Sequence, residues 1–188
     1  KGHNLAALGL PVDLAEARRR AGQPIVSAEI LAELLLEDPT LADHPLLAPY
    51  RPGGSRSDMP LVNFYWDFFA QGKPAAVPIH FPTFEAAVAH IRASGGVSVL
   101  AHPGHTLRGR LDWLPALQGA GLQGLEVFST YHRPEETALL LAGARELGLR
   151  VTAGSDFHGR NKPAIRLGGH GCPLDPAWLL EDLRRAAG

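Results

Sequence analysis

The sequence has few of the features that mark extracellular, membrane or nucleic-acid-binding proteins. Its 188 residues include a single cysteine, Cys172, which excludes an internal disulfide framework. It has no apolar run of about 18 residues, the length needed to span a bilayer. The formal net charge is −1, so the chain has no overall attraction to nucleic acid or to an anionic membrane, and any phosphate recognition must be local. These absences predict a soluble cytoplasmic protein.

Signatures of several common enzyme classes are also missing. There is no Gly-x-x-x-x-Gly-Lys loop, and no Gly-x-Gly-x-x-Gly turn that leaves a strand and opens a helix, which disfavours a nucleoside triphosphatase and a Rossmann dehydrogenase. Ser155 lacks the Gly-x-Ser-x-Gly elbow of a serine nucleophile. Cys172 lies in a glycine-rich loop without a helix start that would activate its thiol. Catalysis by a nucleophilic side chain is therefore disfavoured.

The length suits one medium domain with a small appended subdomain. The chain starts Lys1-Gly2-His3, its only methionine is Met59, and no charged-then-apolar signal segment precedes the first predicted helix. From this start we expect that a longer protein has residues before Lys1.

Residues 76–188 alternate short apolar strands with helices, which predicts the α/β class. The predicted strands start near residues 97, 124 and 151. This even spacing is the length that one strand and one crossover helix occupy, so the predicted order is βαβαβ. Four or five strands are too few to close an eight-stranded barrel of about 250 residues, so we expect only part of a barrel. The predicted strands are 77–80, 97–101, 124–128 and 151–153, and the predicted helices are 84–93, 111–120 and 134–147.

Residues 1–75 predict a small helical cap, with helices over 14–21, 27–37 and 59–70 and a linker over 39–57 that contains proline and glycine. The last helix is rich in aromatic residues. Because basic residues are not interleaved with them, we predict that these aromatic side chains form a core, and a base-stacking surface is the alternative.

Two strand ends run directly into potential metal ligands. The string Ser-Val-Leu-Ala-His-Pro-Gly over residues 98–104 contains His102, and Val-Thr-Ala-Gly-Ser-Asp-Phe-His-Gly over residues 151–159 contains Asp156 and His158. An extended Asp-x-His segment places both side chains on one side, and the loops after parallel strands open onto one edge of the sheet. The sequence predicts that His102, Asp156 and His158 bind a metal such as Zn, Mn or Fe, although singly a turn Asp or a surface His is an open alternative.

Glu126 interrupts the apolar strand Gly-Leu-Glu-Val-Phe. Three interpretations stay open: a buried metal ligand, a group that orients a ligating histidine, or an ion-paired glutamate of the core.

The loops that follow the strands are rich in groups that can carry positive charge, which favours an anionic substrate. Solvated loop charges are the alternative for any one of them. His132 is the strongest single candidate for a phosphate contact, because it precedes a predicted helix start at Pro134. The set comprises His105, Arg108, Arg110, His132, Arg160, Lys162 and Arg166.

Three strings together resemble the polymerase-and-histidinol-phosphatase (PHP) family, and most closely its nucleotide phosphoesterase branch. They are Leu-Ala-His-Pro-Gly at 100–104, Gly-Leu-Glu-Val-Phe at 124–128 followed by Tyr131-His132, and Gly-Ser-Asp-Phe-His-Gly at 154–159. The resemblance spans roughly residues 56 to 170. It implies the C-terminal part of a distorted (β/α)7 barrel with a helical insertion subdomain. It also implies two or three divalent metal ions (Mn, Fe, Zn or Mg) in the complete protein, which activate water to attack a phosphate ester.

When the sequence is matched to the family position by position, the resemblance implies that His102, Asp156 and His158 are metal ligands. It also implies that Asp156 and His158 are catalytic. The family's remaining ligands include an N-terminal His-x-His, which is absent here. His105 stands where the branch commonly has Arg, and Arg56 is a candidate phosphate contact beside His105, His132 and Arg160.

The predicted function is hydrolysis of phosphate esters, of nucleotides or oligonucleotide ends. The alternative is a catalytically degenerate module that only binds a ligand or regulates. The expected partner is a phosphorylated small molecule or a short nucleic-acid end. We do not expect the protein to bind a membrane. We expect the exposed edge of the sheet to be covered either by a second copy of the chain or by a separate N-terminal piece.

Overall fold

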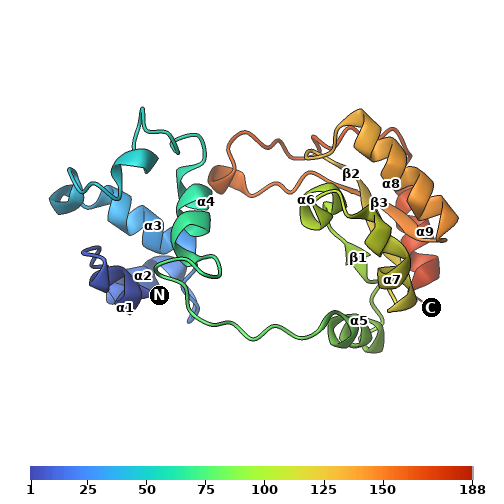
Figure 1. Ribbon diagram of the computed structural model, residues 1–188, viewed down its shortest axis with the longest axis horizontal. Coiled ribbons are helices and arrows are strands. Elements are labelled where there is room, and N and C mark those ends of the chain that lie inside the picture. Colours follow the sequence, from blue (N-terminus) through green and yellow to red (C-terminus); the bar gives the residue numbers. More distant parts are fainter. Residues whose placement is uncertain (188) are drawn as a thin grey trace. The chain divides into compact units, whose positions relative to one another are not determined.

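The computed structural model describes residues 1–187, which form two compact units (Figure 1). The first unit contains residues 1–80 and also residues 158–163, and the second contains residues 81–157 and the chain from 164 onward. The segment that follows the Asp-x-His string therefore belongs partly to each unit. No helix within residues 1–187 is both long enough and apolar enough to cross a membrane.

The first unit is helical. The predicted helices at 14–21 and 27–37 are confirmed, and the predicted helix at 59–70 is present as α4 continued by a π-helical turn, η3. Side chains cap the helices: Asp13 accepts hydrogen bonds from the backbone N–H groups of Ala15 and Glu16, and Ser27 accepts one from Ile30. The elements are α1 (Gly2–Ala7), α2 (Leu14–Ala21), α3 (Ala28–Glu37), η1 (Pro39–Leu41), η2 (Ala48–Tyr50), α4 (Pro60–Phe64), η3 (Tyr65–Phe69) and η5 (Gly159–Asn161).

Aromatic side chains fill the core of this unit. Phe64 and Phe68 stack with their ring centroids 4.3 Å apart, and Tyr50 meets Phe64 edge-on at 5.2 Å. Phe64 is fully buried, whereas Trp66 is 50% exposed. The prediction that the aromatic helix contributes a core is confirmed for the buried rings, which have no free face for a nucleobase.

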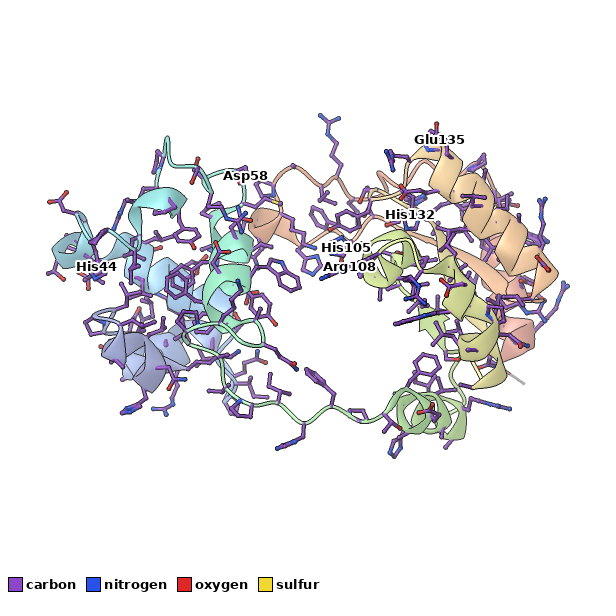
Figure 2. All side chains as sticks on the ribbon, viewed as in Figure 1. His44, Asp58, His105, Arg108, His132 and Glu135 are labelled. Carbon is purple, nitrogen blue, oxygen red and sulfur yellow. The ribbon has the colours of Figure 1, made fainter. Side chains whose placement is uncertain are left out.

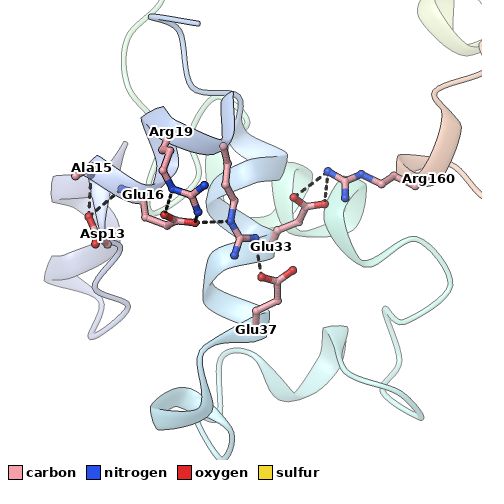
Figure 3. Close-up of polar contacts among 8 residues, drawn as sticks. Asp13, Ala15, Glu16, Arg19, Glu33, Glu37 and Arg160 are labelled. Atoms are coloured by element: carbon pink, nitrogen blue, oxygen red, sulfur yellow. Dashed lines mark hydrogen bonds and ion pairs between the residues drawn. The ribbon is translucent and has the colours of Figure 1, made fainter. Parts of the chain in front are cut away.

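One ion pair in the first unit joins residues that are far apart in the sequence. Glu33 is buried on α3, and Arg160 from η5 places its Nη2 atom 2.9 and 3.1 Å from the two carboxylate oxygens (Figure 3). The same close-up shows the exposed network of Glu16 with Arg19 on α2. Because a buried carboxylate needs a partner, Arg160 explains why α3 tolerates a glutamate on its apolar face.

The second unit is built on a three-stranded parallel sheet in the order β1-β2-β3. The predicted βαβαβ order is confirmed, and α6 and α9 are additional helices. The apolar strands are covered by helices, with α8 against β2 and β3 and α9 against β3. The elements are α5 (Phe84–Ala93), β1 (Val99–Leu100), α6 (Pro103–Leu107), η4 (Leu111–Trp113), α7 (Leu114–Gly119), β2 (Gly124–Ser129), α8 (Pro134–Glu146), β3 (Arg150–Gly154) and α9 (Pro176–Ala186).

The strand predicted at residues 77–80 is wrong. These residues have no regular structure. Pro78 lacks the N–H group that a sheet ladder requires, and Ile79 is 48% exposed. Residues 1–187 therefore contain three strands and not the expected four or five, and a barrel stays a prediction.

A bulge in β2 decides which side chains reach the candidate site. Glu126 pairs with Thr152 and Phe128 pairs with Ala153, so β2 has one extra residue at this point. Because neighbouring paired positions face opposite sides of a sheet, Ser129, which pairs with Gly154, returns to the face of Glu126. Leu125 and Phe128 remain in the core of the unit.

We predict that Arg160→Ala lowers the free energy of unfolding of the helical unit by about 1–2 kcal/mol, because the Glu33 carboxylate loses its partner while it remains buried. The matched control is Arg19→Ala, which breaks an exposed pair and should leave the stability almost unchanged. Urea denaturation followed by circular dichroism measures both.

Replacing Glu33 by Leu in the Arg160→Ala background should recover most of the lost stability, because an apolar side chain needs no partner at that position. Equal destabilisation by Arg160→Ala and Arg19→Ala, with no recovery in the double variant, would contradict the role given to this ion pair.

Candidate functional site

The loops that leave β1, β2 and β3 meet at the carboxyl edge of the sheet in the second unit, the edge where parallel sheets place ligands. Hydrogen bonds join these loops to one another, to β2 and to α6. His105, from α6, and His132, from the loop before α8, lie on this side of the unit (Figure 2).

His102 is held in an uncommon backbone conformation at the start of α6. Its φ angle is +33° and its ψ angle is +58°, the left-handed region that non-glycine residues rarely adopt. Its backbone N–H donates a hydrogen bond of 2.7 Å to Glu126 Oε2. The Glu126 carboxylate lies directly against Gly154, where a Cβ atom would overlap it. This contact is with the backbone of His102 and not with its imidazole, so the three interpretations of Glu126 stay open.

A second hydrogen bond assigns the tautomer of His102. The hydroxyl of Thr106 donates its proton to the carbonyl oxygen of Ala101 at 3.1 Å, so it can only accept from His102 Nδ1, which is 3.0 Å away. A proton is therefore on Nδ1, and in the neutral ring this leaves Nε2 with the lone pair that a metal ion would use. Thr106 was not identified from the sequence, although its position four residues after His102, one turn along α6, is a recognisable signal.

His132 connects two of the loops. Its Nδ1 lies 2.9 Å from the carbonyl oxygen of Val127 and its Nε2 accepts a hydrogen bond of 3.1 Å from the backbone N–H of Gly104. A Cβ atom at position 104 would lie 2.7 Å from the ring, so any larger residue there would have to displace the His132 ring. Because both ring nitrogens have partners, the prediction that His132 binds phosphate stays a prediction.

Asp156 also has a left-handed backbone, with φ at +55°. Its Oδ2 accepts a hydrogen bond of 2.6 Å from the hydroxyl of Tyr131, and the neighbouring Thr130 hydroxyl donates to the carbonyl oxygen of Ser155 at 2.9 Å. Two hydrogen bonds thus join the loop after β2 to the loop after β3.

Ser129 was missed by the sequence analysis. Its side chain is 4% exposed, and its Oγ atom is one of two buried side-chain polar atoms within residues 1–187 that have no hydrogen-bond partner. An orphan hydroxyl at the carboxyl edge, on the face of Glu126, fits a site that receives a polar ligand or ordered water.

The structure brings together only some of the predicted site residues. His102, His105, His132 and Asp156 belong to the second unit, whereas Arg56, His158 and Arg160 belong to the first. No cluster of three or more His, Cys, Asp or Glu side chains that could hold a metal ion is found in the described part of the chain, residues 1–187. The three-residue ligand set therefore stays a prediction, although an imidazole Nε2 and a carboxylate at one sheet edge are donors that fit a divalent ion.

Arg56 is fixed by acidic and aromatic partners within the first unit. Its Nε and Nη2 atoms donate to the Asp67 carboxylate at 3.0 and 3.1 Å, and the Tyr50 hydroxyl donates to the same carboxylate at 2.7 Å. Burial alone would raise the pKa of Asp67, but these hydrogen bonds and the charge of Arg56 outweigh it, so the pKa lies below its usual value. Burial and then the contact with Asp67 raise the pKa of Tyr50. Asp67 therefore stays ionised and holds Arg56 in one orientation.

No protein-family profile matches the sequence. Over 112 residues the chain is 36% identical to a 3′,5′-nucleoside bisphosphate phosphatase from Chromobacterium violaceum, an alignment that covers 56% of this chain and 37% of that protein. Over 113 residues it is 35% identical to the 5′-3′ exoribonuclease Rnm of Escherichia coli, covering 57% of this chain and 38% of that protein. The aligned part thus spans little more than a third of these relatives.

Two solved structures resemble the whole chain. An amidohydrolase from Chromobacterium violaceum, solved with bound sulfate and no metal, superposes with a TM-score of 0.62 and 26% identity and covers 96% of this chain and 60% of that one. A protein from Bifidobacterium adolescentis, provisionally named a metal-dependent phosphoesterase, gives a TM-score of 0.70 at 23% identity, with 100% of this chain and 61% of that one covered. The second similarity concerns the fold alone.

We predict that Gly154→Ala lowers the free energy of unfolding by about 1–3 kcal/mol, because the added methyl group must displace the Glu126 carboxylate from its hydrogen bond with His102. The control is Gly119→Ala on α7, where an added Cβ meets no atom within 4 Å and should leave stability unchanged or slightly raised. Urea denaturation of the two variants tests this, and equal effects would show that the Glu126 contact is not tightly packed.

Proposed function

We propose, from its homology to a nucleotide phosphatase and to exoribonucleases, that this chain forms part of a metal-dependent phosphoesterase. These relatives bear out the resemblance to the PHP family. Because the alignments reach only part of each relative, the activity, the substrates and the ligand set of the whole protein are part of the proposal.

The observation that carries the proposal is the pair of ligand-type residues at the ends of β1 and β3, the two strands that flank β2. The His102 Nδ1 atom donates to Thr106, which leaves Nε2 of the neutral ring available to a metal ion, and Asp156 is held by a tyrosine hydroxyl on the same sheet edge. Divalent ions at such a site supply positive charge that activates water and neutralises phosphate oxygens. His158, two residues after Asp156 in the chain, is the proposed third ligand.

The proposed substrate is a phosphate ester of a nucleotide or of an oligonucleotide end, as the names of the relatives suggest. Four basic side chains are the proposed phosphate contacts: Arg56, His105, His132 and Arg160. His105 is exposed and lies on α6 directly after the His102 turn, which supports its assignment. His132, whose nitrogens have backbone partners, would have to exchange one of these hydrogen bonds for the phosphate. The sulfate bound to the Chromobacterium amidohydrolase is a tetrahedral anion, as a phosphate group is.

A degenerate module that binds a phosphorylated ligand without hydrolysing it is the second candidate. The absence of a His-x-His string from the sequence favours it for this chain taken alone. The two candidates differ in turnover and not in binding, so one set of assays separates them.

We predict that the full-length protein with Mn²⁺ releases product from a nucleoside 3′,5′-bisphosphate or from a 5′-phosphorylated oligoribonucleotide, and that Asp156→Asn lowers its kcat at least 100-fold, equivalent to about 3 kcal/mol in barrier height. An amide cannot supply the negative charge that a metal ligand at this position needs. Asp43→Asn, a change at an exposed carboxylate of the first unit, is the matched control and should leave kcat unchanged.

Product release is measured as inorganic phosphate for the first substrate and as mononucleotide for the second. Wild-type turnover that Asp156→Asn leaves intact with metal in excess would refute the role of Asp156. Saturable substrate binding by the wild-type chain without turnover would identify the degenerate module instead.

A further inference from the structure

One short hydrogen bond at the carboxyl edge involves a residue to which neither the predicted ligand set nor the predicted phosphate contacts assign a role. The hydroxyl of Tyr131 donates to Asp156 Oδ2 at 2.6 Å, across 25 positions of the sequence. This length is typical of a hydrogen bond from a hydroxyl to an ionised carboxylate, which is stronger than one between neutral groups.

The chain on both sides of Tyr131 is held by side-chain contacts of its neighbours. Thr130 donates to the carbonyl oxygen of Ser155, and the ring of His132 is held by Val127 and Gly104. Both neighbours of Tyr131 are thus anchored, Thr130 to the loop after β3 and His132 to β2 and α6.

The Tyr131 ring also contacts the two histidines of the neighbouring loop. Its centroid is 5.8 Å from that of His102, edge-on at 89°, and 5.5 Å from that of His105, tilted by 31°. The ring therefore packs against one predicted metal ligand while its hydroxyl binds the other. The labels of His105 and His132 in Figure 2 mark where this region lies.

The contact matters because the backbone of Asp156 is left-handed, and this local conformation does not by itself fix the direction of the carboxylate. A carboxylate is planar, so a hydroxyl bound to Oδ2 also fixes the direction in which Oδ1 points. Groups that bind ligating carboxylates and histidines in this way tune metal affinity by about 10- to 100-fold.

We propose that Tyr131 is a positioning residue that sets the orientation of the Asp156 carboxylate toward a divalent ion, while its ring keeps His102 at a fixed distance from that carboxylate. The inference rests on the proposed function, because it needs Asp156 to be a metal ligand. It adds a residue whose effect acts through Asp156 and not through contact with the substrate.

The substitution Tyr131→Phe tests this directly, because it removes the hydroxyl and keeps the ring that packs on His102 and His105. The matched control is Tyr65→Phe in the first unit, where the ring contact is with Trp66. Mn²⁺ is the probe, and isothermal titration calorimetry of the purified 188-residue chain gives the affinity. Thermal denaturation in the absence of metal reports any loss of folding.

Tyr131→Phe should weaken Mn²⁺ binding at least 10-fold with little change in the metal-free melting temperature, and Tyr65→Phe should change neither. Asp156→Asn should weaken binding further, and the double variant Tyr131→Phe/Asp156→Asn should be no weaker than Asp156→Asn alone, because the hydroxyl acts only through the carboxylate.

Three results overturn the inference, and they have different meanings. Equal Mn²⁺ affinity in wild type and Tyr131→Phe removes the role of Tyr131 and leaves the proposed function standing. Additive losses in the double variant show that the hydroxyl acts elsewhere than on Asp156. No Mn²⁺ binding by the wild-type chain removes the metal site of the proposed function and this inference with it.

Discussion

The arrangement of the carboxyl edge depends on the hydrogen bond from the His102 backbone to the Glu126 carboxylate. Glu126 lies in the middle strand of the sheet, so its carboxylate reaches the ends of both neighbouring strands, at His102 on one side and Gly154 on the other. A charged acceptor stabilises the left-handed backbone of His102, which would otherwise be strained. The hydrogen bond to the His102 backbone thus explains why an apolar strand contains a glutamate. The carboxylate of Glu126 also leaves no room for a side chain at position 154, which is a glycine.

The segment after β3 has a different constraint. Asp156 is positioned by the loop after β2, whereas residues 158–163 belong to the helical unit, where Arg160 is paired with the buried Glu33. The Asp-x-His string therefore has one ligand-type residue in each unit. Within the helical unit, Arg56 is likewise held by the carboxylate of Asp67.

Much of the fold was predictable because it follows from local patterns. The evenly spaced apolar runs gave β1, β2 and β3, and capping residues such as Thr83 marked helix starts, since its hydroxyl accepts from the backbone N–H of Ala86. The strand at 77–80 failed because its β-branched residues have no neighbouring strand to pair with. In the site, topology alone was enough to place His102 and Asp156 on one edge. The contacts of Tyr131 and Glu33 were not predictable, because they depend on loop backbones with positive φ and on a pairing across 127 positions of the sequence.

The central claim is that the ends of β1 and β3 bind one divalent ion between them. The most direct test is a crystal structure of the chain grown with Mn²⁺, with the ion located by anomalous scattering. The account predicts a peak within roughly 2.0–2.3 Å of both His102 Nε2 and an Asp156 carboxylate oxygen. A well-ordered structure with no anomalous peak at this edge, or with a peak that contacts neither residue, would contradict it.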